Sequence, residues 1–154
     1  GKLAGNAKIF KCPSDKFIFP GSGYKDSYVR SVSMNMWMAW DAAAGSLVGA
    51  GKNYKRQADI GKPSDRFVFV HEDPHFIEDG TFRLNFSATP GAQPPLIFEN
   101  SPAALHNRSS SLGFVDGHVE LHRWEKTLVT NGIVIPVLTS QSDVLWLKEK
   151  TTDY

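Results

Sequence analysis

The sequence predicts an α+β fold, in which a small antiparallel β-sheet packs with short helices and long loops. Three observations lead to this prediction. Several runs of strand length are apolar or alternate polar with apolar residues, and turn residues separate them. One segment near the end of the chain has a helical pattern. Thirteen glycines and nine prolines among 154 residues indicate many turns. This length suits one domain over residues 1–154 that buries its own core.

Three segments in the first part of the chain carry strand patterns. Residues 28–35 alternate between two sets of side chains, which is typical of a strand. Residues 65–71 form the clearest strand, and their continuous apolar run suggests burial on both faces. A third strand is expected at residues 81–86, after the turn signal of residues 78–80.

The second half of the chain predicts a β-hairpin. Residues 112–115 and 118–124 form its strands, and Asp116-Gly117 forms its turn. Asp-Gly favours a two-residue turn in which both residues have positive φ. The alternative is one bent strand with a bulge at Gly117.

Two segments carry helical signals. Residues 101–105 resemble a short helical turn, with Ser101 as the cap and Pro102 at the first position. Residues 140–150 are expected to form the last helix, because Ser140 and Asp143 have capping-box-like spacing. Apolar residues on this helix could pack against the core, namely Val144, Leu145 and Leu147.

Charge and cysteine content restrict the function classes. The formal net charge is +1, and no basic cluster of the kind that binds nucleic acid is visible. Cys12 is the single cysteine, so no intramolecular disulfide forms. No apolar run reaches the roughly 18–20 residues that span a bilayer. Because Gly1 reads like an internal boundary, a membrane anchor ahead of it in the full gene product is compatible with this sequence.

The motifs of common catalytic sites do not occur in the sequence. There is no G-x-S-x-G nucleophile motif and no phosphate-binding loop that ends in G-K-S/T. Cys12 stands beside Pro13 with no histidine nearby in the sequence, which disfavours a thiol nucleophile. The sequence therefore favours a protein that is not an enzyme.

His106 opens the pattern H-x9-D-G, which closes at Asp116 and Gly117. This pattern resembles the prepilin-type processing-associated H-x9-DG domain of bacterial pilin-like proteins. Other pieces of the chain are similar to that family in the same order: Phe10-Lys11-Cys12-Pro13-Ser14-Asp15, Ser31-Val32-Ser33-Met34-Asn35, Phe67-Val68-Phe69-Val70 with Glu72, Asp79-Gly80, Gly113-Phe114-Val115 ahead of Asp116, His118-Val119-Glu120, His122-Arg123-Trp124 and Asp143-Val144-Leu145-Trp146-Leu147. One position departs from the family, since His71 stands where an acidic residue is expected.

The resemblance implies a pilin-like head whose long N-terminal helix is missing from this sequence. In such proteins that helix anchors the chain in the inner membrane, and a prepilin peptidase processes it. The implied function is that of a non-enzymatic structural or assembly subunit of a type IV pilus or a type II secretion pseudopilus. Its partners would be other pilin or pseudopilin subunits and the secretion machinery, and its head would lie in the cell envelope, on the periplasmic or extracellular side.

The residues of the motif pieces are predicted to be structural. We expect His106 to hydrogen-bond the turn that carries Asp116, whose carboxylate would accept bonds from backbone N–H groups. Trp124 is expected to anchor the far end of the hairpin. The alternative is a zinc site, because His118, Glu120 and His122 would project from one face of a strand. The full structural set comprises His106, Asp116, Gly117, His118, Trp124, Cys12, Asp15 and Asn35.

The loop after the clearest strand is a candidate calcium site, because oxygen ligands in a loop suit calcium. Its candidate ligands are Glu72, Asp73, Glu78 and Asp79. The alternative is ordinary turn chemistry, in which Glu72 pairs with Arg66, Arg83 or a backbone turn.

Residues 34–40 are rich in methionine and tryptophan, and Trp37 and Trp40 are candidates for a partner or ligand surface. Core packing is the alternative for this stretch. Two further functions therefore stay open beside the structural subunit. One is an extracellular carbohydrate- or ligand-binding module that uses these aromatic residues, and the other is a metal-dependent hydrolase.

Overall fold

The computed structural model describes residues 5–18, 29–38, 52–85, 97–98, 100–130, 133–136 and 141–153. The strands are β1 (Val32–Asn35), β2 (Phe67–His71), β3 (Thr81–Phe82), β4 (Leu84–Asn85), β5 (Ile97–Phe98), β6 (Ser109–Phe114), β7 (Val119–Arg123), β8 (Thr127–Thr130) and β9 (Ile133–Pro136). The helices are the 3₁₀ turns η1 (Ala7–Phe10), η3 (Gln57–Asp59) and η4 (Pro63–Asp65), and the α-helix α1 (Gln141–Thr151). The α+β class is confirmed.

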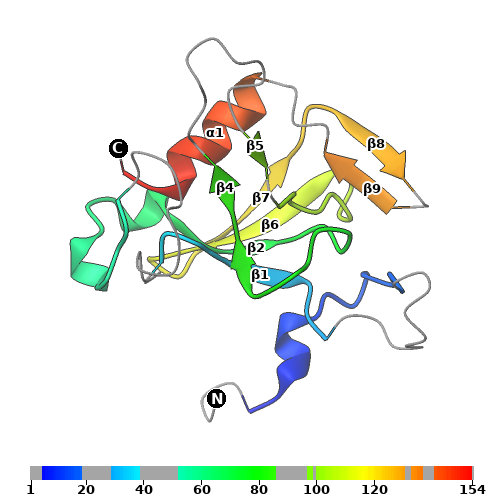
Figure 1. Cartoon of the computed structure of the whole chain (residues 1–154), viewed down its shortest axis with the longest axis horizontal. Coiled ribbons are helices and arrows are strands. Elements are labelled where there is room, and N and C mark those ends of the chain that lie inside the picture. Colours follow the sequence, from blue (N-terminus) through cyan, green and yellow to red (C-terminus); the bar gives the residue numbers. More distant parts are fainter. Residues whose placement is uncertain are drawn as a thin grey trace.

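The main sheet has five strands in the order β3-β1-β2-β6-β7 (Figure 1). Three of its pairs are antiparallel, but β1 and β3 are parallel. The prediction of a purely antiparallel sheet is therefore wrong. The β3 strand follows the loop of residues 72–80, which carries the chain around to the outer edge of β1 (Figure 1). Two short pairs, β4–β5 and β8–β9, stand apart from this sheet.

Helix α1 packs against one face of the sheet, as the helical pattern predicts. Val144, Leu147 and Thr151 are buried and lie one to two turns apart on the same side of the helix. Leu145, which we expected in this packing face, is 45% exposed, because its position on the helix points it away from the sheet. The core around Leu147 contains Phe67, Val70, Phe82, Leu84, Ala104, Leu112, Phe114 and Trp124.

A β-bulge in β2 changes which of its side chains face the core. The register against β6 shifts between Phe67 and Phe69. In a regular strand two residues this far apart share a face, but an extra residue in the ladder places them on opposite faces. Phe67 is accordingly buried in the core and Phe69 is 41% exposed. The prediction that this strand is buried on both faces is therefore wrong.

Polar residues line the inner face of β1. Ser33 and Asn35 are buried, while Met34 between them is exposed. Asn35 donates from Nδ2 to the carbonyl oxygens of Phe67 (2.9 Å) and Thr151 (2.8 Å). It thereby joins β1 to β2 and to the end of α1, which agrees with the structural role predicted for Asn35.

The prediction of a helical turn at residues 101–105 is wrong. Pro102 instead forms an antiparallel bridge with Glu72, and the Asp73 N–H donates to the Ser101 carbonyl oxygen (2.8 Å). The chain is extended here because it lies beside the segment that follows β2. Of the two residues with capping-box-like spacing before the last helix, Ser140 lies outside the described residues. The carboxylate of the other, Asp143, accepts from the Glu125 N–H (2.9 Å). Among the helices that the structure describes, none is long and apolar enough to cross a membrane.

Candidate functional site

The turn at Asp116 closes the β6–β7 hairpin as expected, although its type differs. Asp116 Oδ1 accepts from the His118 N–H (3.1 Å), so the carboxylate caps the turn as predicted. Gly117 alone has positive φ (+93°) in this turn, whereas the expected two-residue turn needs positive φ at both positions. The Phe114 carbonyl oxygen accepts from the Gly117 N–H (3.0 Å), and the Phe114 N–H donates to the His118 carbonyl oxygen (2.9 Å). This pattern is a longer turn that ends in a glycine bulge.

His106 does not contact this turn, so the predicted hydrogen bond to it is wrong. Strand β6 separates the two, and a six-residue strand spans about 20 Å. The nine-residue spacing of the motif therefore corresponds to one strand and the residues that flank it. His118 bonds Asp116 in its place, with 2.6 Å between its Nδ1 and Asp116 Oδ1. Its ring also stacks on Phe114.

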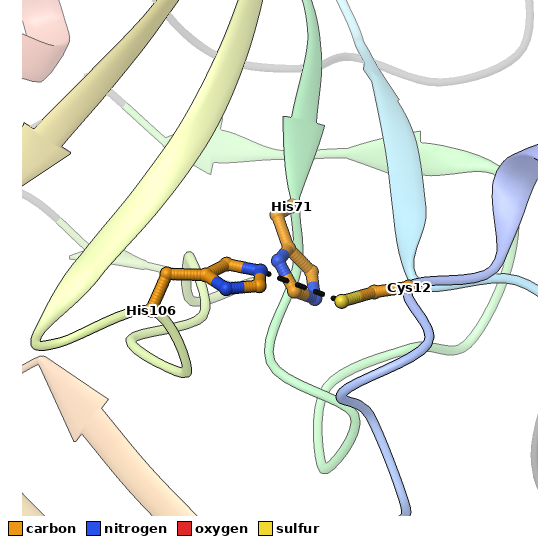
Figure 2. Close-up of side chains that lie close together, drawn as sticks. All are labelled: Cys12, His71 and His106. Atoms are coloured by element: carbon orange, nitrogen blue, oxygen red, sulfur yellow. Dashed lines mark hydrogen bonds between the residues drawn. The ribbon is translucent and has the colours of Figure 1, made fainter.

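His106 instead lies in a cluster with Cys12 and His71 (Figure 2). One ligand atom from each residue, the thiol sulfur or a ring nitrogen, lies within 4.8 Å of the other two. Cys12 Sγ is 3.4 Å from His106 Nε2. The two imidazole rings have their centroids 5.4 Å apart. Among the described residues, this is the only such grouping of three or more His, Cys, Asp or Glu side chains.

The turn after η1 positions Cys12. The Cys12 N–H donates to Ser31 Oγ (3.1 Å), and that hydroxyl donates to Asp15 Oδ2 (2.6 Å). Asp15 Oδ2 also lies 2.6 Å from Lys11 Nζ. Burial alone would raise the pKa of Asp15, but hydrogen bonds from Lys11, Ser31 and the Phe17 N–H outweigh it and lower the pKa. Asp15 is therefore an ionised, buried support for the cysteine turn, as the structural role predicted for it requires.

Strand β2 ends at His71 and fixes its backbone. The His71 carbonyl oxygen accepts from the Ala103 N–H (2.8 Å), and the side chain is 2% exposed. Burial, together with the nearby His106 ring, lowers the pKa of His71 to about 4. The ring is therefore uncharged at neutral pH. Its Nε2 is buried and has no hydrogen-bond partner.

A tight turn at residues 106–109 holds His106. Asn107 and Arg108 both have positive φ (51° and 65°), and the Ser109 N–H donates to the His106 carbonyl oxygen (3.0 Å). Asparagine tolerates this backbone conformation, but arginine rarely adopts it, so the surrounding structure must hold the turn. It does so through the backbone N–H of Trp124, which donates to the Arg108 carbonyl oxygen (2.9 Å).

Trp124 fixes the same region from the core side. Its indole N–H lies 3.1 Å from the Ala103 carbonyl oxygen and 2.9 Å from Ser110 Oγ, and its side chain is fully buried. These contacts agree with the anchoring role predicted for Trp124. The tryptophan holds the segment that precedes His106, through Ala103, as well as the end of the hairpin.

The candidate calcium ligands do not gather into one group. Glu72 is fully buried beside Ser33, whose hydroxyl donates to it, and burial raises the pKa of Glu72 to about 7. Asp73 is also buried and accepts from the His75 N–H (2.9 Å). Asp79 accepts from the Thr81 N–H (2.7 Å) and pairs with Arg83, and Glu78 is exposed. The turn-chemistry alternative describes Asp73 and Asp79, whereas the carboxylate of Glu72 bonds the side chains of Ser33 and Asn100 rather than an arginine or a backbone turn.

The zinc alternative on β7 has the same difficulty, because its histidines have separate partners. His118 pairs with Asp116, as described above. His122 Nε2 lies 3.1 Å from Asp143 Oδ1, and the His122 ring stacks on Trp146. The described side chains of β7 therefore do not form a metal-ligand group.

Trp37 does not form a surface, which corrects its assignment to a partner or ligand site. The residue is 6% exposed, and its neighbours Met36 and Met38 are buried too. Core packing is thus the correct interpretation for these three residues. Trp40 lies outside the described residues.

Sequence reasoning missed the cluster because its members are far apart in the chain. In the sequence His71 marks a departure from the family pattern beside the acidic loop, and Cys12 has no histidine nearby. The available signal was topological: the end of β2 and the start of β6 meet if these strands pair antiparallel. Comparisons of the chain with protein-family models, curated proteins and solved structures found no match.

Proposed function

We propose that this chain is the head of a pilin-like or pseudopilin-like assembly subunit, with a structural role in the cell envelope. The observation that carries the proposal is an apolar patch on the face of the main sheet that points away from α1. We call this patch the outer apolar row. It consists of Met34, Phe69, Val119 and Leu121, with exposed fractions of 39%, 41%, 69% and 64%.

Strand register places these four side chains on one face. Met34 is opposite Phe69, Phe69 is opposite Gly113, and Gly113 is opposite Val119. Leu121 follows two residues after Val119 and therefore shares its face. The row thus crosses four adjacent strands on the side of the sheet away from α1.

Such a row favours an assembly role. A sheet that buries one face normally carries polar residues on the other, so contiguous exposed apolar side chains mark an interaction surface. The bulge in β2 contributes to the row directly, because it turns Phe69 outward. A long apolar helix or a neighbouring subunit is the kind of partner that a flat apolar sheet face accommodates.

The motif residues also fit a structural role. Asp15 supports the cysteine turn, Asn35 joins β1 to α1, Asp116 caps a hairpin and Trp124 holds the loop before β6. Each bond holds a turn in place or joins two segments of the chain. This use of the residues that carry the family resemblance favours a scaffold over a catalytic centre.

The first experiment examines the full-length gene product in its own cells. Mass spectrometry of the mature N-terminus is expected to find cleavage after a leader that ends in glycine, followed by an apolar helix. The protein is also expected in the sheared surface or envelope fraction. An unprocessed N-terminus together with a soluble cytoplasmic protein would overturn the proposal.

The second experiment tests the outer apolar row. The double variant Val119→Ser/Leu121→Ser is expected to be lost from the envelope or filament fraction. Its isolated chain is expected to keep the melting temperature of the wild type. Leu145→Ser is the matched control, since Leu145 is an exposed leucine on α1, outside the row. Equal assembly of the double variant and wild type would show that the row is not the assembly surface.

A further inference from the structure

We propose that Cys12, His71 and His106 form a binding site for one thiophilic metal ion of the zinc class. The site would clasp the N-terminal segment to the sheet. The inference is independent of the proposed function, because it concerns a different part of the molecule.

The distances suit a tetrahedral ion. Zinc with Zn–N of about 2.0 Å and Zn–S of about 2.3 Å holds its ligand atoms about 3.3–3.6 Å apart. The 3.4 Å between Cys12 Sγ and His106 Nε2 already has this value. The third ligand atom lies within 4.8 Å of both others, so it has to approach by at most about 1.5 Å.

His71 supplies an independent observation that points to a ligand. Its side chain is 2% exposed, and its Nε2 has no hydrogen-bond partner. A buried polar atom without a partner is unfavourable, and native structures normally avoid it. Figure 2 shows the His71 ring beside the contact between Cys12 and His106, and one ligand atom of each residue lies within 4.8 Å of the other two. A metal ion held by all three residues would satisfy this nitrogen.

The donor set selects the class of metal. One thiolate and two imidazoles suit zinc and related borderline or soft ions, whereas calcium and magnesium take oxygen ligands. The charged side chains near the sulfur are Lys11 and Asp15, which pair with each other at 2.6 Å and so offset one another. A divalent ion with one thiolate therefore leaves a single net positive charge. Cys12 and His106 are half-buried, which leaves a fourth position open to water.

The backbone holds all three ligands before any metal arrives. Cys12 is fixed through Ser31, His71 ends a central strand, and His106 sits in a tight turn braced by Trp124. Cys12 lies 59 residues before His71, and His71 lies 35 residues before His106. A metal bound here would cross-link the segment after η1 to both β2 and the start of β6.

Cobalt titration provides the test. The chain is prepared without a polyhistidine tag, reduced, and titrated with Co²⁺ as a spectroscopic substitute for zinc. We expect one equivalent to bind, with visible bands of tetrahedral cobalt and a near-ultraviolet band of thiolate-to-cobalt charge transfer. Zinc is expected to displace the cobalt. Zinc at about 100 times its Kd is expected to raise the melting temperature by about 5–10 °C.

Variants separate the cluster from other histidines. Cys12→Ser is expected to abolish the charge-transfer band, and His106→Gln to weaken binding at least tenfold. His118→Gln is the matched control, since it makes the same substitution in an exposed turn at the other end of β6, and it should bind like wild type. Cys12 and His106 are both half-buried, so these variants avoid the folding risk of changing His71. Circular dichroism checks that each variant is folded.

Three outcomes would overturn the proposal. One is the absence of a charge-transfer band in the folded wild-type chain. Another is equal loss of binding in His118→Gln and His106→Gln. The third is a combined result from alkylation of Cys12. The alkylation rate of the wild type would be the same with and without zinc, and the rate in His106→Gln would be lower than in the wild type. That result would assign the pair to a reactive thiol with a histidine partner.

Discussion

Strands β2 and β6 pair along their length, and their two ends have opposite polar chemistry. At one end His71 and His106 meet Cys12, with an unpartnered nitrogen on His71. At the other end Arg66, the residue before β2, is fully engaged. Its Nε lies 3.1 Å from Asp153 Oδ1, and its Nη1 lies 3.0 Å and 2.7 Å from the carbonyl oxygens of Asp65 and Glu149.

The difference distinguishes a site that only stabilises the fold from one that can also bind a ligand. At the arginine end the donors of Arg66 are already bonded to carboxylate and carbonyl oxygens, so this residue has little left to offer an incoming group. The cysteine–histidine end consists of side chains with lone pairs that face one another. Both ends lie on the same strand pair. The predictions below test whether stability resides at the arginine end and binding capacity at the cysteine–histidine end.

The largest expected effect is at the arginine end. Arg66→Ala removes the bonds to Asp153, Asp65 and Glu149 and is expected to lower the free energy of unfolding by about 2–4 kcal/mol. Arg66→Lys keeps the charge but loses the planar fork, so its loss should be smaller. Urea unfolding measures both. Metal-free His106→Gln should change stability far less, and a loss equal to that of Arg66→Ala would contradict the comparison.

The next effect concerns the tryptophan that braces the turn of His106. Trp124→Phe removes the indole N–H and leaves a smaller ring, and we expect a loss of about 1–3 kcal/mol. Ser110 Oγ still donates to the Ala103 carbonyl oxygen, which limits the penalty. Cobalt affinity should fall as well, because the lost indole N–H also bonds the Ala103 carbonyl oxygen in the segment that leads to His106. A variant that loses stability but keeps full cobalt affinity would show that the turn does not depend on this tryptophan.

The sequence predicted the elements whose signals are local. The β6–β7 hairpin follows from Asp116-Gly117 between two strand patterns, and α1 follows from apolar residues at helical spacing. Strand β2 follows from its apolar run. In each case the residues that form the element are adjacent in the chain, so the pattern contains the information.

The sequence could not predict features that depend on pairing between distant segments. The parallel pairing of β1 with β3 and the bulge at Val68 are set by neighbouring strands. The inward orientation of Ser33 and Asn35 depends on bonds to Glu72 and Thr151. The Cys12–His106 contact joins residues 94 positions apart. It requires that the β1–β2–β6 order be known first.

A smaller effect is expected at the hairpin turn. Gly117→Ala forces a Cβ into a backbone with φ of +93°, which costs about 1–2 kcal/mol. No atom lies within 4 Å of the added Cβ, so the loss reflects the backbone alone. Gly61→Ala is the matched control, because its Cβ also meets open space and its φ is not positive. Thermal melts of both variants should show a loss only at Gly117, with zinc binding unchanged in each.

The smallest expected effect is the acid sensitivity of the arginine end. Burial alone would raise the pKa of Asp153, but hydrogen bonds from Arg66 and Tyr54 outweigh it and hold the pKa below its ordinary value of 3.8. A carboxyl group with a lowered folded-state pKa contributes stability that is complete above its unfolded pKa and is lost as the pH falls through the folded pKa. Asp153→Asn removes this titration. The stability difference between wild type and Asp153→Asn should therefore be constant from pH 7 to about pH 5 and shrink below about pH 4. Urea unfolding at each pH measures it, and a difference that stays constant down to pH 2 would mean that Arg66 is held by its carbonyl partners rather than by Asp153.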